Sequence, residues 1–249
     1  MNRIRGAWLC AALLVCAGWV AQARTYWAYY DCAPGVTTVL VLTNASEYER
    51  EEAVTLRLYD AEGMPVVESV YDLAAYESTA VFLNGLLVET DESTWGLAEI
   101  ESQLLLQVGV WLGTEDEWLF VENYGELTVG LSDVAIETYW YGVNYANTEN
   151  RQTTVTILNP AERLIYGTLY LYDAHGMLQE YEQIPLPARQ PTYIEVESLY
   201  PIGDDVWGLI DIQTSGAVLV VCGYFDAEGY LIDVDVIDQP YYMQYGSED

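Results

Sequence analysis

Carboxylates dominate the side chains that could do chemistry in this chain. The 249 residues include 39 acidic and 8 basic ones, all eight of them arginine, and a single histidine, for a formal net charge of −31. Without lysine, no side-chain amine can act as a base or Schiff-base nucleophile. His175 stands in a predicted turn with no triad-like serine or cysteine near it in the sequence. We therefore predict a non-enzymatic protein with no catalytic residue.

Paired carboxylates would be the remaining route to catalysis. A glycosidase needs two of them across a cleft at a defined separation. Glu99 and Asp211 occupy equivalent places in the two halves of the chain, and such duplication is typical of a scaffold. A hydrolase that uses acidic residues is therefore the least favoured alternative.

Calcium is the metal that these carboxylates favour, because Ca²⁺ prefers hard oxygen ligands. Asp233 and Asp235 alternate on one face of a predicted strand, and Asp204 and Asp205 lie in a loop. The spacing of an EF-hand is absent, and two carboxylates on one strand face are also typical of a solvated surface. A calcium-dependent surface protein stays open as an alternative, and no other cofactor is expected.

Aromatic side chains offer a binding surface rather than a reaction centre. The chain has 22 tyrosines and 8 tryptophans. The residues predicted to form a partner or ligand face are Arg57, Tyr59, Trp95, Tyr170, Tyr172 and Trp207. Such residues can stabilise a sheet by cross-strand pairing, form a protein interface, or stack against a sugar.

The first 23 residues are predicted to be a secretory signal peptide. Arg3 and Arg5 precede an apolar run of 14 residues, Ala7–Val20, and Ala21-Gln22-Ala23 fits a cleavage site. The run is shorter than the roughly 20 residues that span a bilayer, which disfavours an uncleaved anchor. We expect a secreted or periplasmic protein without a membrane span, whose acidity disfavours nucleic acid as a partner.

Two cysteines, Cys32 and Cys222, remain after cleavage at that site. An oxidising compartment would allow them to form one disulfide. The alternative is two buried free thiols, because cysteine packs like a small apolar residue. In the repeat alignment Cys32 matches Tyr145 and Cys222 matches Val108, so a bridge would join the start of the first copy to the end of the second.

An internal repeat organises the chain. The segment Thr55–Met64 (TLRLYDAEGM) returns 113 residues later as Thr168–Met177 (TLYLYDAHGM), and the same shift aligns Thr25-Tyr26-Trp27 with Thr138-Tyr139-Trp140. Repeats of this kind indicate one structural unit used twice. The predicted organisation is a signal peptide over 1–23, a module over 24–122, a connection over 123–137, a second module over 138–240 and a tail over 241–249.

Each copy has the pattern of an antiparallel β-sandwich. Val54, Leu56 and Leu58 alternate with outward residues, as in a half-buried strand. Asp60–Gly63 then predicts a hairpin, in which the aspartate bonds to its own backbone and glycine supplies a positive φ. With seven or eight short strands predicted in each copy and no sustained helical period, the fold class is all-β, two tandem antiparallel sandwiches. Gly96 and Gly208, each after a tryptophan, predict close backbone approach beneath an indole ring.

The strand pattern resembles the immunoglobulin-like sandwiches of secreted bacterial proteins and the sensory rhodopsin transducer-like domains. The second resemblance rests on Leu42-Thr43-Asn44, Leu58-Tyr59-Asp60 with Gly63, Phe82-Leu83-Asn84 and Ile100-Glu101-Ser102, and on Leu158-Asn159, Leu171-Tyr172-Asp173 and Gly176 in the second copy. It implies an oligomerising sandwich, with binding of a sugar or small ligand as one role. A transducer partner is not implied.

These observations predict an exported interaction or structural protein. It would use a tyrosine-rich, acidic sheet face against a protein partner or a second copy of itself. A carbohydrate-binding module that recognises a glycan is the main alternative.

Overall fold

The computed structural model describes residues 24–45, 52–87, 94–103, 105–114, 118–124, 136–148, 151–199, 206–228, 231–237 and 239–245. The predicted signal peptide and most of the predicted connection lie outside these ranges. The strands of the first half are β1 Arg24–Cys32, β2 Thr37–Asn44, β3 Glu52–Tyr59, β4 Pro65–Leu73, β5 Ser78–Phe82, β6 Thr94–Ser102, β7 Leu106–Gly113 and β8 Trp118–Tyr124.

The second half repeats this series and adds one strand. Its strands are β9 Ile136–Asn147, β10 Gln152–Leu158, β11 Ile165–Asp173, β12 Leu178–Leu186, β13 Pro191–Glu195, β14 Val206–Thr214, β15 Leu219–Phe225, β16 Leu231–Ile237 and β17 Tyr242–Tyr245. Two four-residue helices, α2 (Leu83–Leu86) and α3 (Val196–Leu199), follow β5 and β13. In the described ranges, no helix has the length and apolarity to cross a membrane.

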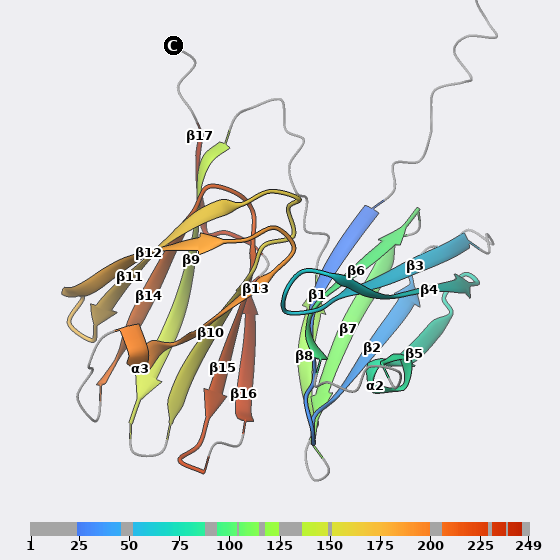
Figure 1. Ribbon diagram of the computed structural model, residues 1–249, viewed down its shortest axis with the longest axis horizontal. Coiled ribbons are helices and arrows are strands. Elements are labelled where there is room, and N and C mark those ends of the chain that lie inside the picture. The colour runs from blue at the N-terminus through green and yellow to red at the C-terminus, as the bar shows by residue number, and fades with distance from the viewer. Residues whose placement is uncertain are drawn as a thin grey trace, which may run out of the picture.

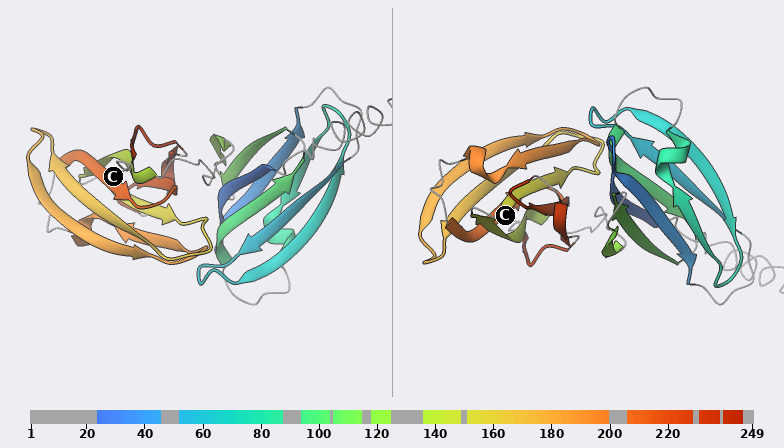
Figure 2. Two further views of the ribbon diagram at one scale, coloured as in Figure 1. Left: turned by 90° about the horizontal axis from the view of Figure 1, so that it is seen from above. Right: turned by 90° about the horizontal axis from the view of Figure 1, so that it is seen from below.

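The sheets confirm the predicted all-β, antiparallel fold class. In the first half the strand orders are β1-β6-β3-β4 and β5-β2-β7-β8. In the second they are β12-β11-β14-β9-β17 and β13-β10-β15-β16, which is the same arrangement with β17 added beside β9. Figure 1 shows the two halves side by side, each with its two sheets packed face to face, and Figure 2 shows them from above and below.

The predicted alternation places the core correctly. Val54, Leu56 and Leu58 are fully buried between the sheets of the first half, and Leu169 and Leu171 are buried in the second. The first core also includes three residues from the second half, Leu158, Leu219 and Val221. Apolar packing therefore continues from one half into the other.

The hairpin prediction is also confirmed. The Asp60 Oδ1 atom accepts hydrogen bonds from the backbone N–H groups of Glu62 (3.0 Å) and Met64 (2.7 Å). The counterpart Asp173 does the same toward His175 and Met177, at 2.9 Å each. Gly63 and Gly176 both have φ of 75°, a left-handed conformation that favours glycine. The repeated motif is thus turn chemistry.

Strand register corrects part of the repeat alignment. The Tyr26 hydroxyl accepts the Leu106 N–H, whereas the Tyr141 hydroxyl accepts the Val218 N–H, both at 3.0 Å. Tyr26 therefore corresponds to Tyr141 and not to Tyr139. A slip of two residues keeps every side chain on the same face, so the aromatic pattern of the sequence could not exclude it. By the same register, Cys32 corresponds to Asn147 and Cys222 to Val110.

Gly96 and Gly208 mark the predicted close backbone approach, because an added Cβ would collide with the backbone carbonyl of Tyr59 or Tyr172 on the adjacent strand. One further expectation differs from the structure. The predicted tail, 241–249, contains β17, whose backbone pairs with β9. The repeat did not reveal this strand because no counterpart of it appears among the described residues of the first half.

Candidate interaction surface

Two corresponding sheet faces carry most of the predicted site residues. We call the outer face of β1-β6-β3-β4 the β3 face, and the outer face of β12-β11-β14-β9-β17 the β11 face. The two faces share a register, in which Arg57 pairs with Glu68 and Glu99, and the counterpart Tyr170 pairs with Tyr181 and Asp211. Their chemistry differs, because one is charged and the other is aromatic.

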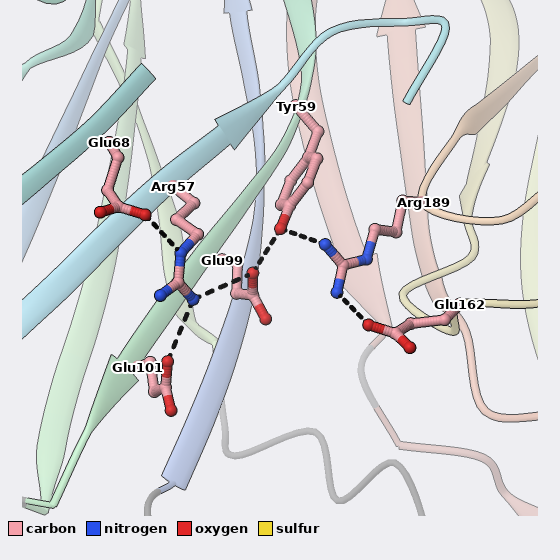
Figure 3. Close-up of polar contacts among 7 residues, drawn as sticks. All are labelled: Arg57, Tyr59, Glu68, Glu99, Glu101, Glu162 and Arg189. Carbon is pink, nitrogen blue, oxygen red and sulfur yellow. Dashed lines mark hydrogen bonds and ion pairs between the residues drawn. The ribbon is translucent and has the colours of Figure 1, made fainter. Parts of the chain in front are cut away.

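A single cation organises the carboxylates of the β3 face. The guanidinium of Arg57 lies 2.8 Å from Glu68, 3.0 Å from Glu101 and 3.6 Å from Glu99 (Figure 3). The hydrogen bonds that the guanidinium donates to Glu68 and Glu101 raise the pKa of Arg57 further above its ordinary value. The predicted binding residue Arg57 is therefore already engaged within its own sheet.

Tyr59 points outward from its sandwich, as predicted, but the second half covers it. Only 3% of its surface is exposed. Its hydroxyl donates to Glu99 (2.7 Å) and accepts from the guanidinium of Arg189, which also lies over the Tyr59 ring, 4.7 Å from its centroid. Arg189 in turn pairs with Glu162 at 2.7 Å (Figure 3). Tyr59 therefore belongs to a contact between the halves.

Trp95 belongs to the same internal contact. Its ring meets Tyr29 edge-on at 6.4 Å, and meets Tyr193 of the second half at 6.3 Å. Nearby, the Gln190 side-chain amide donates to the Glu62 carbonyl at 2.6 Å. The three predicted site residues of the first half thus serve to organise the chain itself.

The β11 face carries a stack of three aromatic rings. Trp140 and Tyr170 stack with centroids 5.9 Å apart and planes 22° apart, and Tyr170 and Tyr181 stack at 6.3 Å and 28°. The Tyr170 hydroxyl donates to the Gln213 side chain at 3.1 Å. Offset stacking of this kind adds about 0.5–1.5 kcal/mol per pair beyond simple burial. The stack replaces the ion pair of Arg57 and Glu68 in the first half.

The β11 face stays open to solvent. Tyr181 is 63% exposed and Trp207 is 60% exposed. Tyr241, 62% exposed, lies against Gly142, where an added Cβ would meet its ring at 3.6 Å, and its hydroxyl donates to Asp211 at 2.8 Å. Burial, with help from Asp211, raises the pKa of Tyr241 to about 12.

Tyr241 supplies a ring that the second half otherwise lacks. By register, Gly142 is the counterpart of Trp27 in the first half, and Asp211 is the counterpart of Glu99. The ring of Tyr241 therefore lies where the first half has the indole of Trp27. Its hydroxyl bonds to Asp211, just as the Tyr59 hydroxyl bonds to the equivalent Glu99 in the first half. Glu99 and Asp211, which looked like a duplicated carboxylate pair, are each held by a tyrosine in separate halves.

The structure brings three of the predicted face residues, Tyr170, Tyr172 and Trp207, together on the β11 face. Trp140, Tyr181 and Tyr241 lie on the same face and were not singled out from the sequence. Binding of a partner by this face stays a prediction. Tyr181 could have been found from the repeat, because it is the counterpart of Glu68, which is cross-strand from Arg57. Tyr241 follows the repeated segment, so the repeat gave no indication of its position.

The calcium candidates do not form a cluster in the part of the chain that the structure describes. Asp233 lies 3.9 Å from the Arg151 guanidinium, and Asp235 accepts the Tyr224 hydroxyl at 3.1 Å. Among described residues, no three or more histidines, cysteines or acids come together as a metal site. Asp204 and Asp205 lie outside the described ranges.

The bridge between Cys32 and Cys222 is absent, and both thiols are free. Cys222 is buried in the second core, while Cys32 packs against the first core, with its Sγ atom 3.4 Å from the Asn84 side chain. Of the two alternatives that the sequence left open, the structure shows free thiols, because each cysteine is held in a different sandwich. Burial raises the pKa of Cys32 to about 11 and of Cys222 to about 12, so thiolate is scarce at neutral pH.

Comparison with known proteins shows no family for this chain. No family model and no curated protein matches it. Among solved structures, a glycosyl hydrolase family 2 member from Bacteroides cellulosilyticus is similar at 10% identity and a TM-score of 0.20, over 86% of this chain and 27% of that one. A beta-glucuronidase 2 from Bacteroides uniformis is similar at 12% identity and 0.20, over 90% and 26%. This chain spans about a quarter of the length of either, and likeness at this level carries no argument about function.

Proposed function

We propose that this chain is an exported, non-enzymatic interaction protein that binds a protein partner through the β11 face. The observation that carries the proposal is the replacement of the Arg57 and Glu68 ion pair by the stacked pair of Tyr170 and Tyr181 at the same place in the repeat. In the first half, Tyr59 and Trp95 of the β3 face contact the second half, while the charged pair beside them stays partly exposed, with 62% of the Glu68 side chain accessible to solvent. The aromatic version lies on the face that stays open.

The geometry of the stack supports a protein partner over a sugar. A sugar ring inserted between two aromatic rings would need two carbon contacts of about 3.5–4.0 Å each, or about 7–8 Å in total. The centroids of Trp140, Tyr170 and Tyr181 are 5.9 and 6.3 Å apart, so the inner ring faces are occupied by one another. The stack offers ring edges and hydroxyls, which suit a protein interface.

A carbohydrate-binding role is the second candidate. It is favoured by Trp207 and Tyr241, whose rings are largely exposed, and by the carboxylate of Asp211 beside Tyr241. Open rings beside a hydrogen-bonding acid can stack against a sugar and bind its hydroxyls. This role would use the edge of the β11 face rather than the stack.

A double substitution tests the proposal with little risk to the fold. Tyr170→Arg with Tyr181→Glu imports the cross-strand pair that the first half already tolerates. Wild type and variant would be immobilised and exposed to the exported protein fraction of the source cells, and each would be applied to a glycan array. Val70→Arg, at an exposed apolar position on β4, is the matched control.

We expect wild type and the Val70 control to retain the same protein, and the double variant to lose it. Removing two interface aromatics should cost at least about 2 kcal/mol, or roughly a 30-fold loss of affinity. A monomeric wild type that binds defined glycans and retains no protein would overturn the proposal in favour of the carbohydrate role.

A further inference from the structure

The contact between the two halves joins a hairpin to a turn. The hairpin of Gly63, between β3 and β4, meets the 187–190 turn between β12 and β13. A Cβ added at Gly63 would lie 2.8 Å from the Gln190 Cγ atom and 2.9 Å from the Ala188 carbonyl. Within that turn, Arg189 reaches Tyr59 and Gln190 reaches Glu62.

Both members of this contact recur in the other half, and there they are open. The hairpin of Gly176 has the same φ as that of Gly63, but an added Cβ would meet nothing within 4 Å. The turn between β4 and β5 places Tyr76 at a φ of 60°, where the other turn has Arg189 at 56°. Tyr76 is 67% exposed. The chain thus carries two copies of each contact element, the hairpin and the turn. One copy of each takes part in the internal contact, and the other does not, so we call the latter the unused elements.

The two unused elements lie at opposite ends of the molecule. In Figure 1 the hairpin between β11 and β12 is at the far left and the turn between β4 and β5 is at the far right, and the views in Figure 2 agree. They are therefore too far apart to meet within one copy, although they can meet between two copies.

We propose that copies of this chain associate head to tail. The turn of Tyr76 in one copy would lie against the Gly176 hairpin and the β11 face of the next copy, as the turn of Arg189 lies against the Gly63 hairpin and the β3 face. This inference rests on the proposed function and names its partner as a second copy. Because the surfaces that meet are different, the contact can repeat and yields a filament, or a ring if the rotation closes.

The chemistry of the open surfaces fits this contact. Tyr172 is the counterpart of Tyr59, so it would receive Tyr76 where Tyr59 receives the guanidinium of Arg189. An aromatic pair would replace the cation over the ring. The net charge of −31 opposes association, and salt screens that repulsion. We therefore expect the assembly to strengthen as salt is added.

The intermolecular contact should be weaker than the internal one. The connected halves meet at a high effective concentration, whereas separate copies do not. We expect a dissociation constant on the order of 100 μM, which corresponds to about 5.5 kcal/mol. Assembly should therefore be visible as an increase in average mass with concentration.

Cysteine cross-linking tests which surfaces meet. In the internal contact, the Gln190 side chain is bonded to the Glu62 carbonyl. The counterpart of Gln190 in the other half is Glu77, and the counterpart of Glu62 is His175. Glu77→Cys and His175→Cys would be prepared separately in the full chain, mixed and oxidised. Glu228→Cys is the matched control, since Glu228 is exposed and holds the same hairpin position, with its N–H bonded to Asp226 at 3.0 Å.

We expect mixed dimers of the Glu77 and His175 variants in at least about tenfold excess over mixtures of the Glu77 and Glu228 variants. Equal yields would overturn the inference, as would a predominance of dimers between two Glu77 variants, which a symmetric contact would produce. Wild type, with its free Cys32 and Cys222, is the blank.

Sedimentation velocity gives a second reading. The average mass of wild type should rise with protein concentration and with salt, and Tyr76→Glu should need several-fold more protein for the same mass. If wild type stays monomeric while the β11 face still retains a different protein in a Tyr170-dependent way, the head-to-tail inference falls and the proposed function stands. A monomer that binds only glycans would overturn both.

Discussion

At the scale of single residues, Tyr59 shows how an outward side chain becomes internal. It leaves the outer face of its own sandwich and would be exposed if the first half stood alone. The second half covers it and supplies Arg189, while Glu99 accepts a hydrogen bond from its hydroxyl. One hydroxyl thus joins a cation and an anion from the two halves.

Tyr59→Phe should therefore destabilise the protein. The substitution removes the hydroxyl that bonds to Glu99 and Arg189, and hydrogen bonds to charged groups contribute about 1.5–3 kcal/mol. We expect the free energy of unfolding in urea to fall by about 2 kcal/mol. Tyr172→Phe is the control, because the Tyr172 hydroxyl makes no hydrogen bond among the described residues. Equal losses in the two variants would contradict this role for Tyr59.

The same variant should change the response to alkali. Burial first, and then Glu99, raises the pKa of Tyr59 from 10.0 to about 12, so the folded state binds this proton more tightly than the unfolded chain. That stabilisation is complete below pH 10 and is lost as the pH rises from 10 to 12. Over this window, the stability of Tyr59→Phe should therefore fall less steeply than that of wild type.

The sequence predicted which side chains point outward but not which of them are exposed. Period-two alternation places Tyr59, Tyr170 and Tyr172 on outer faces correctly. Whether an outer face is covered depends on how the two halves pack, and no local pattern encodes that. Arg57 and Tyr170, equivalent positions at which the two copies differ, were the clearest signal, and they mark the charged face and the aromatic face.

At the scale of elements, the Asp-Ala-X-Gly hairpins have two different structural roles. All of them use aspartate to bond the turn backbone. In the first half the hairpin also meets the turn of Arg189, whereas a Cβ added at Gly176 would meet nothing within 4 Å. One local structure thus serves both as a simple turn and as a contact element.

Gly63→Ala and Gly176→Ala should distinguish the role in closing the turn from the role in contacting the other half. Both place a Cβ at a φ of 75°, which costs about 1–2 kcal/mol. Only at Gly63 would the Cβ also collide with the turn of the other half. We expect the Gly63 variant to lose about 1–2 kcal/mol more in urea unfolding, the range given for overpacking. Matching losses would show that the hairpin does not touch the second half in solution.

Strand positions were more predictable than strand register. The apolar alternation and turn residues indicated the sandwich strands and the hairpins correctly. The two-residue offset between β9 and the sequence alignment with β1 was not predicted, because a shift by two residues keeps each side chain on the same face of the sheet. The strand β17 was not predicted because the repeat offered no counterpart of it in the part of the first half that the structure describes. The short helices α2 and α3 are too brief to produce a helical period.

At the scale of the whole molecule, the halves are joined by unequal surfaces. The β3 face of the first half contacts the β13-β10-β15-β16 sheet of the second half, not the β11 face. The two halves are therefore arranged head to tail rather than symmetrically. Leu158, Leu219 and Val221 continue the first core across the boundary. Arg189 and Gln190 supply polar contacts there, to Tyr59 and Glu62.

Arg189→Glu should loosen this arrangement. It removes the cation from Tyr59 and places a carboxylate near Glu99 and Glu162, while the apolar packing remains. We expect a larger radius of gyration in small-angle X-ray scattering at low protein concentration. Tyr76→Glu, at the equivalent turn and a similar φ, should leave the scattering unchanged. A scattering curve of Arg189→Glu that superimposes on wild type would mean that apolar packing alone holds the halves.

The position of Tyr241 has a consequence for the order in which the chain matures. The first half carries Trp27 in its own first strand, and can complete its face as soon as its strands pair. The second half takes the equivalent ring from a segment made after all the strands of the repeat. During synthesis, where earlier segments generally fold first, the open face is therefore finished only once residues 239–245 are available. A chain whose last residues have yet to pair with β9 would thus present an unfinished β11 face to its neighbours.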